Sequence, residues 1–98
     1  METELAQALG HLRQASHQLL SLADPSGQEL LLAARILDLE ELLGELGVEP
    51  TYVSAAGTAK QSLLNASSHL IRATPPVPSS VWPTLRSLLA MTDGYGNR

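Results

Sequence analysis

Cysteine and phenylalanine are absent from this chain of 98 residues, and its only aromatic side chains besides histidine are Trp82, Tyr52 and Tyr95. Without cysteine the chain forms no disulfide, offers no thiol nucleophile and provides no thiolate ligand for a metal. Hydrophobic residues nevertheless make up 44% of the sequence, so we expect a globular fold whose core is aliphatic.

Long hydrophobic runs are also missing. No uninterrupted apolar stretch approaches the ~20 residues that a membrane-spanning helix needs, and no basic segment precedes an apolar run near residue 1. We therefore expect a cytoplasmic protein that makes no membrane contact. The length fits one domain over residues 1–91, followed by a flexible tail over residues 92–98.

Basic side chains are few, because the chain has six Lys and Arg against ten Asp and Glu and carries a net charge of −4. The stretch 28–46 accounts for this whole net charge, since Arg35 is its only cation. This distribution argues against a broad phosphate-binding face and favours a partner with basic residues. The acids of the stretch are Glu29, Asp38, Glu40, Glu41 and Glu45.

The stretch 28–46 also has apolar residues on two sides of a helix. One side is spaced by alternating steps of four and three residues and comprises Leu32, Ile36, Leu39, Leu43 and Leu46. The opposite side is a narrower strip made of Leu30, Ala33, Ala34 and Leu37, with Glu41 at its edge. A helix that is apolar on two sides needs two neighbours. The strip is therefore a candidate binding surface for a second copy or a helical partner, or it is covered by other helices of the same domain.

The remaining helices are predicted from their spacing and their capping residues. A first helix of about twenty residues begins after Thr3, and Ser26 with Glu29 forms a capping box that opens the second helix. Gly47 occupies the left-handed position that ends the second helix, and Pro50 starts a third helix built mostly from small residues.

Prolines within 75–78 end the third helix, and a short fourth helix follows, in which Trp82 is expected to close one end of the bundle. The fold class is thus all-α, an antiparallel helical bundle of three long helices and one short C-terminal helix.

Catalytic and metal-binding patterns are missing from the sequence. His11 and His17 are six residues apart and so do not share a helix face, and no nucleophile–base pair, glycine-rich phosphate loop or cofactor motif is present. Glu41 and Glu45 share a helix face, but this face is turned away from the leucine side. We therefore expect their carboxylates to lie in solvent and not in a metal site of the core. We expect neither an enzyme nor a bound metal or cofactor.

Two short segments resemble known families. Residues 68–72, Ser-His-Leu-Ile-Arg, resemble the phosphoacceptor segment of histidine phosphotransfer domains, which implies a phosphorylated histidine at His69. Residues 42–54 resemble helix-turn-helix regulators through Gly47, Val48 and Val53. That resemblance implies a DNA-reading unit over residues 42–60, although Lys60 is its only cation.

The sequence thus favours a non-catalytic helical protein–protein interaction module that self-associates through its second helix, as a homodimer or with a helical partner. The predicted contact residues are Leu30, Ala33, Ala34, Leu37 and Glu41. The alternatives are the helix-turn-helix regulator and, as a minor one, the phosphotransfer-like domain. We expect no specific binding of duplex DNA, because the segment that would read DNA follows the most acidic part of the chain.

Overall fold

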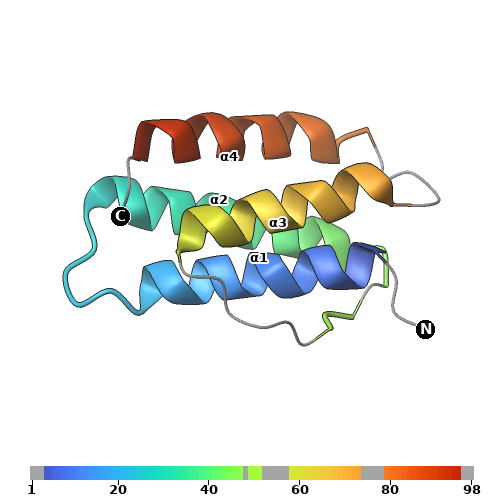
Figure 1. The fold of residues 1–98 in the computed structure, drawn as a ribbon, viewed down its shortest axis with the longest axis horizontal. Helices are drawn as coiled ribbons and strands as arrows, with labels where there is room; N and C mark the ends of the chain where they lie inside the picture. Colours follow the sequence, from blue (N-terminus) through green and yellow to red (C-terminus); the bar gives the residue numbers. More distant parts are fainter. Residues whose placement is uncertain (1–3, 48, 52–57, 74–78, 96–98) are drawn as a thin grey trace.

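Four helices make up the fold of the computed structural model, which describes residues 4–47, 49–51, 58–73 and 79–95. They are α1 (Glu4–Leu20), α2 (Gly27–Gly44), α3 (Ala59–Arg72) and α4 (Val81–Tyr95), and no strand occurs within those ranges. α1 and α4 run in one direction, whereas α2 and α3 run in the other (Figure 1). The predicted all-α antiparallel bundle is confirmed. The C-terminal helix is not a short one, however, because α4 has 15 residues and α3 has 14.

The order of the helices around the bundle leaves one weak seam. α1 packs on both α3 and α2, and α2 packs on α4, so each packed pair is antiparallel. α3 and α4 make only slight contact, and α2 and α3 make none among the described residues. The bundle is therefore a ring in the order α1, α2, α4, α3, and it is least tightly closed between α3 and α4.

The core is aliphatic, as the composition predicts. The predicted leucine side of α2 faces it through Leu32, Ile36, Leu39 and Leu43, all of them buried. α1 and α3 make the most extensive contact, and both helices bury several small residues, which favour a close approach of their backbones. The buried small residues of the two helices include Ala8, Ala15, Ala59, Ala66 and Ser62. The Ser62 hydroxyl donates a hydrogen bond to Gln18 Oε1 across this contact at 3.0 Å.

Local capping fixes the start of α2. The Glu29 amide donates to Ser26 Oγ at 3.2 Å, and the Ser26 amide donates to Glu29 Oε1 at 2.8 Å, which is the predicted capping box. A cap of this kind typically stabilises a helix by about 1 kcal/mol. At the other end α2 stops at Gly44, while Gly47 has the expected left-handed backbone, with φ of 80°. Leu46 lies beyond the helix and is 46% exposed, so it does not extend the buried leucine side.

The connection from α2 to α3 differs from the prediction. Glu49, Pro50 and Thr51 are not helical, and Thr58 has an extended backbone and caps α3, so α3 starts at Ala59 and not at Pro50. The Thr51 amide donates to the Ala6 carbonyl at 3.1 Å, which ties this connection to α1. α2 ends at one end of the bundle and α3 begins at the other, so α3 runs parallel to α2 (Figure 1).

The last helix extends further than the sequence predicts. α4 continues to Tyr95, and Thr92 is buried with its hydroxyl donating to the Leu88 carbonyl at 2.7 Å. Residues 92–95 thus belong to the last helix and not to a tail. The predicted cap at Thr3, the prolines of 75–78 and residues 96–98 lie outside the described ranges.

Candidate interaction surfaces

The outer face of α2 carries four of the five predicted contact residues at the surface. Leu30 is 47% exposed and Leu37 is 45% exposed, while Ala34 and Glu41 are exposed as well. Ala33 is only 1% exposed and belongs to the core, so its assignment to a binding surface is corrected. Leu30, Ala34, Leu37 and Glu41 follow one another at steps of three and four residues, and they are called the α2 strip below.

Acidic side chains surround the α2 strip at its C-terminal end. Asp38, Glu41 and Glu45 are exposed, and the last turn of α2 has no basic residue. The carbonyl end of a helix carries a partial negative charge, so acidic side chains there are unfavourable. No cation in the last turn compensates for this repulsion, and a cation brought by a partner would relieve it.

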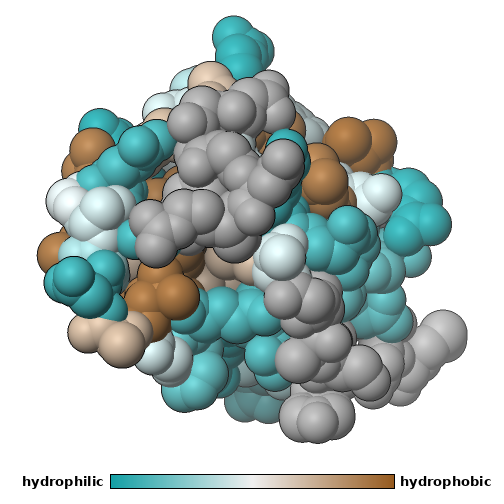
Figure 2. All heavy atoms as spheres, turned by 60° about the vertical axis from the view of Figure 1, so that its left-hand side comes forward, coloured by the Kyte–Doolittle hydropathy of each residue, from teal (hydrophilic) through white to brown (hydrophobic). Residues whose placement is uncertain are grey.

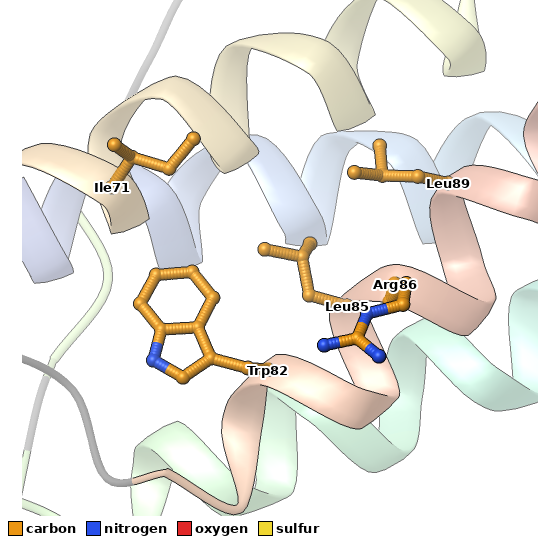
Figure 3. A pocket seen from close by; sticks show the side chains of 5 residues that line it. All are labelled: Ile71, Trp82, Leu85, Arg86 and Leu89. Carbon is orange, nitrogen blue, oxygen red and sulfur yellow. The ribbon is translucent and has the colours of Figure 1, made fainter.

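The slight contact between α3 and α4 leaves an open groove of about 300 Å³. Ile71 of α3 forms one wall and is 70% exposed, while the other four lining residues come from α4 (Figure 3). Leu85 is buried, whereas the Arg86 side chain is exposed. The groove, called the α3/α4 groove below, is lined by Ile71, Trp82, Leu85, Arg86 and Leu89.

The chemistry of the α3/α4 groove suits a few apolar side chains accompanied by one carboxylate. Its volume is at the lower limit of the ~300–1,000 Å³ that is typical of small-molecule sites. Four of its five lining side chains are apolar and the fifth is a cation. A nucleotide or a similar cofactor needs more space and several convergent polar groups, which these five residues do not supply.

The sequence reasoning missed this groove, because it assigned Trp82 to closing one end of the bundle. Trp82 is partly buried in the first turn of α4, where it packs against the core and also lines the groove. A signal was present: Trp82 and Leu89 are seven residues apart on α4, and Leu64 and Ile71 are seven apart on α3 and outside its buried side. Spacing alone could not reveal that these two apolar sides face a common opening.

A polar cluster joins α1 to α3 and comprises Glu4, His11, His69 and Arg72. Glu4 Oε2 lies 2.5 Å from His69 Nδ1 and 3.8 Å from Arg72 Nε. Because an ionised carboxylate only accepts hydrogen bonds, His69 Nδ1 is the donor in its contact with Glu4. The His11 and His69 rings stack with their centroids 5.3 Å apart and their planes 12° from parallel.

The environment of this cluster shifts two of its pKa values. The hydrogen bond to His69, with the positive charges of Arg72 and His69, holds the pKa of the Glu4 carboxyl below its usual value. Burial, and then the charge of His69, lower the pKa of His11. His11 Nδ1 is itself buried without a hydrogen-bond partner. These contacts favour an ionised Glu4 and a neutral His11 in the folded protein.

His69 is partly buried in this cluster, with only 17% of its side chain exposed, whereas the phosphotransfer resemblance implies an exposed phosphoacceptor. Nothing within the described structure tests that minor alternative further.

No group of three or more His, Asp or Glu side chains among the described residues is arranged to hold a metal ion.

The segment that resembles a helix-turn-helix is described only in part. Such a unit joins its helices by a turn of about 3–4 residues. Here α2 ends at Gly44 and α3 begins at Ala59, so α3 is not the second helix of a unit of that kind. Val48, Val53 and Ser54 lie outside the described ranges, and the DNA-binding alternative stays an untested hypothesis.

Viewed towards the end of the bundle where α1 leads into α2, hydrophobic side chains reach the surface in separate patches between hydrophilic ones (Figure 2).

None of the helices described is long and apolar enough to cross a membrane. Comparisons with known proteins identify no matching family model, no matching curated protein and no matching solved structure.

Proposed function

We propose that this protein is a non-catalytic helical protein–protein interaction module that self-associates through the α2 strip. The observation that carries the proposal is the exposure of Leu30 and Leu37, each close to half exposed, on a helix whose opposite side is fully buried. Water-exposed leucines that lie above one another on a stable helix gain free energy when a partner covers them. Ala34 lies between them and is small enough to allow a close approach.

The α2 strip is accessible without any rearrangement of the bundle. Leu39 and Leu43 anchor α2 in the core, and the capping box fixes its first turn, so the strip is presented on a rigid element. A pre-organised surface loses little conformational entropy on binding. No catalytic role is part of the proposal, because neither the α2 strip nor the α3/α4 groove contains a base next to a nucleophile.

The decisive experiment replaces Leu37 with Glu and measures mass and helicity together. Sedimentation of the wild type over a range of concentrations should reveal an assembly, and Leu37→Glu should sediment as a monomer. Circular dichroism should be unchanged, because Leu37 is half exposed and the new carboxylate stays in water.

The matched control is Leu20→Glu, which adds the same charge at a leucine that is 52% exposed at the end of α1. α1 contributes no residue to the α2 strip or to the α3/α4 groove, so this variant should associate as the wild type does. A wild type that remains monomeric at high protein concentration would refute the proposal. So would a Leu37→Glu variant that associates with unchanged affinity.

A further inference from the structure

We infer that the surface receiving the α2 strip is the α3/α4 groove of a second copy of this chain. The inference rests on the proposed function, since it names the partner surface for self-association through α2. Three pairings of the two surfaces are conceivable, namely strip with strip, groove with groove, and strip with groove. Charge and shape decide among them.

Charge favours neither symmetric pairing. A parallel strip-to-strip contact would bring the exposed acids Asp38, Glu41 and Glu45 of two copies close together, and an antiparallel one would keep them apart but offer them no cation besides Arg35. A groove-to-groove contact would set one Arg86 against another. Like charges held together in an interface cost free energy that burial of the apolar residues has to offset.

The strip-to-groove pairing brings opposite charges together. Glu41 belongs to the α2 strip, and Arg86 is the only charged residue lining the α3/α4 groove. A cation beside the last turn of α2 also compensates for the acids at the negative end of that helix. No ion pair to Arg86 is found within the described ranges, and its exposed guanidinium is free to meet a carboxylate there.

Shape leads to the same choice. Two convex helices touch along a single line, whereas a helix laid in a groove contacts both walls and buries more surface. A stable interface buries about 800 Å² per partner, which four residues on one helix face do not supply alone. Trp82 and Leu89 are seven residues apart on α4, as Leu30 and Leu37 are on α2, so apolar contacts can match over two turns.

Such a contact joins two different surfaces of the molecule and is therefore heterologous. One copy offers its strip to the groove of the next and keeps its own groove available for another copy. This property permits a complementation test that separates the three pairings.

The test uses Leu37→Glu, which damages the strip, and Ile71→Glu, which damages the groove at its most exposed apolar residue. Each variant alone should associate at least about tenfold more weakly than the wild type, while an equimolar mixture should regain a 1:1 complex in sedimentation. If Ile71→Glu self-associates as the wild type does, the strip pairs with itself and the inference is wrong, although the proposed function stands. If the mixture stays monomeric while the wild type associates, the inference is equally wrong. A monomeric wild type would overturn both.

A charge exchange tests the pairing of Glu41 with Arg86. Glu41→Arg and Arg86→Glu should each weaken self-association, because each sets two like charges against one another. Mixing the two variants should restore association, since the new Arg of one then meets the new Glu of the other. Both side chains are exposed, so neither change threatens the fold. Trp82, the only tryptophan of the chain, supplies a local readout. Its fluorescence should shift to shorter wavelength as the wild type associates, since the groove is then closed to water. Association that leaves this emission unchanged would contradict the inference.

Discussion

Glu4 Oε2 lies 2.5 Å from His69 Nδ1, so the first turn of α1 is joined to the last turn of α3 across 65 residues of sequence. Arg72 Nε lies 3.8 Å from the same oxygen, and the His11 ring stacks on a face of the His69 ring. The contact helps to hold together the two helices that pack most extensively. Its strength should depend on pH, because the folded protein lowers the pKa of Glu4 and that of His11.

We predict that Glu4→Gln lowers the melting temperature at pH 7 and that this difference disappears in acid. The folded protein lowers the pKa of Glu4, chiefly through its hydrogen bond with His69. A lowered carboxyl pKa contributes stability above the unfolded value of about 4.5, and this contribution is lost as the pH falls through the folded value. Thermal unfolding at pH 7 and pH 3 would test this, with Asp24→Asn in the exposed α1–α2 connection as the control. An equal effect of Glu4→Gln at both pH values would contradict it.

We predict that His11 titrates below its usual pKa of 6.5 in the folded protein, because burial and the neighbouring His69 disfavour its charged form. A lowered histidine pKa gives stability that is fully present above pH 6.5 and is lost as the pH falls through the folded value. The neighbouring charged groups, Glu4 and Arg72, belong to the same cluster. The imidazole signals of His11 can be followed by NMR from pH 8 to pH 4, with His11→Gln to assign them. A midpoint at or above 6.5 would show that the ring is not held in its neutral form.

We predict that Glu40→Gln raises the melting temperature at pH 7. Burial raises the pKa of Glu40, with Ser16 and Arg13 of α1 offsetting part of the effect, and one of its carboxylate oxygens is buried without a hydrogen-bond partner. A raised carboxyl pKa gives stability below the unfolded value of 4.5 that is lost as the pH rises through the folded value. The neutral amide should therefore help at pH 7 and change little at pH 4. A lower melting temperature at pH 7 would mean that the ionised Glu40 stabilises the contact with α1.

We predict that Leu39→Ala destabilises the fold by about 2–5 kcal/mol, because Leu39 is completely buried and its truncation leaves a cavity. Such a loss corresponds to a melting temperature lower by roughly 10–30 °C for a domain of this size. The control is Leu31→Ala on the exposed side of the same helix, whose effect should stay within about 0.5 kcal/mol. Similar melting temperatures for the two variants would show that the assigned orientation of α2 is wrong.

Local rules in the sequence were sufficient to predict where α2 begins and which side of it is buried. Ser26 and Glu29 satisfy each other's backbone amides within three residues, so their geometry needs no help from the rest of the fold. The buried side, from Leu32 to Leu43, follows from the 3.6-residue period alone. For the same reason, four residues of the predicted contact surface were correctly placed on the exposed face.

Ala33 shows where that reasoning stops. It lies between the exposed and buried sides of α2, seven residues before Glu40, which faces Ser16 and Arg13 of α1. A periodic pattern cannot decide on which side of such a boundary a residue falls. The position of α1 decides it, and that position depends on contacts between helices.

The sequence by itself determined that four helices form, which side of α2 is buried and the acidic character of α2, because periodicity, capping and charge act over a few residues. Only the tertiary structure decided the order of the helices around the bundle, the parallel course of α2 and α3 and the pairing of Glu4 with His69. It also decided that α3 and α4 leave a groove between Ile71 and Trp82. These features depend on which apolar sides cover one another. Several arrangements bury similar areas, so the choice among them is made by the packing of the whole chain.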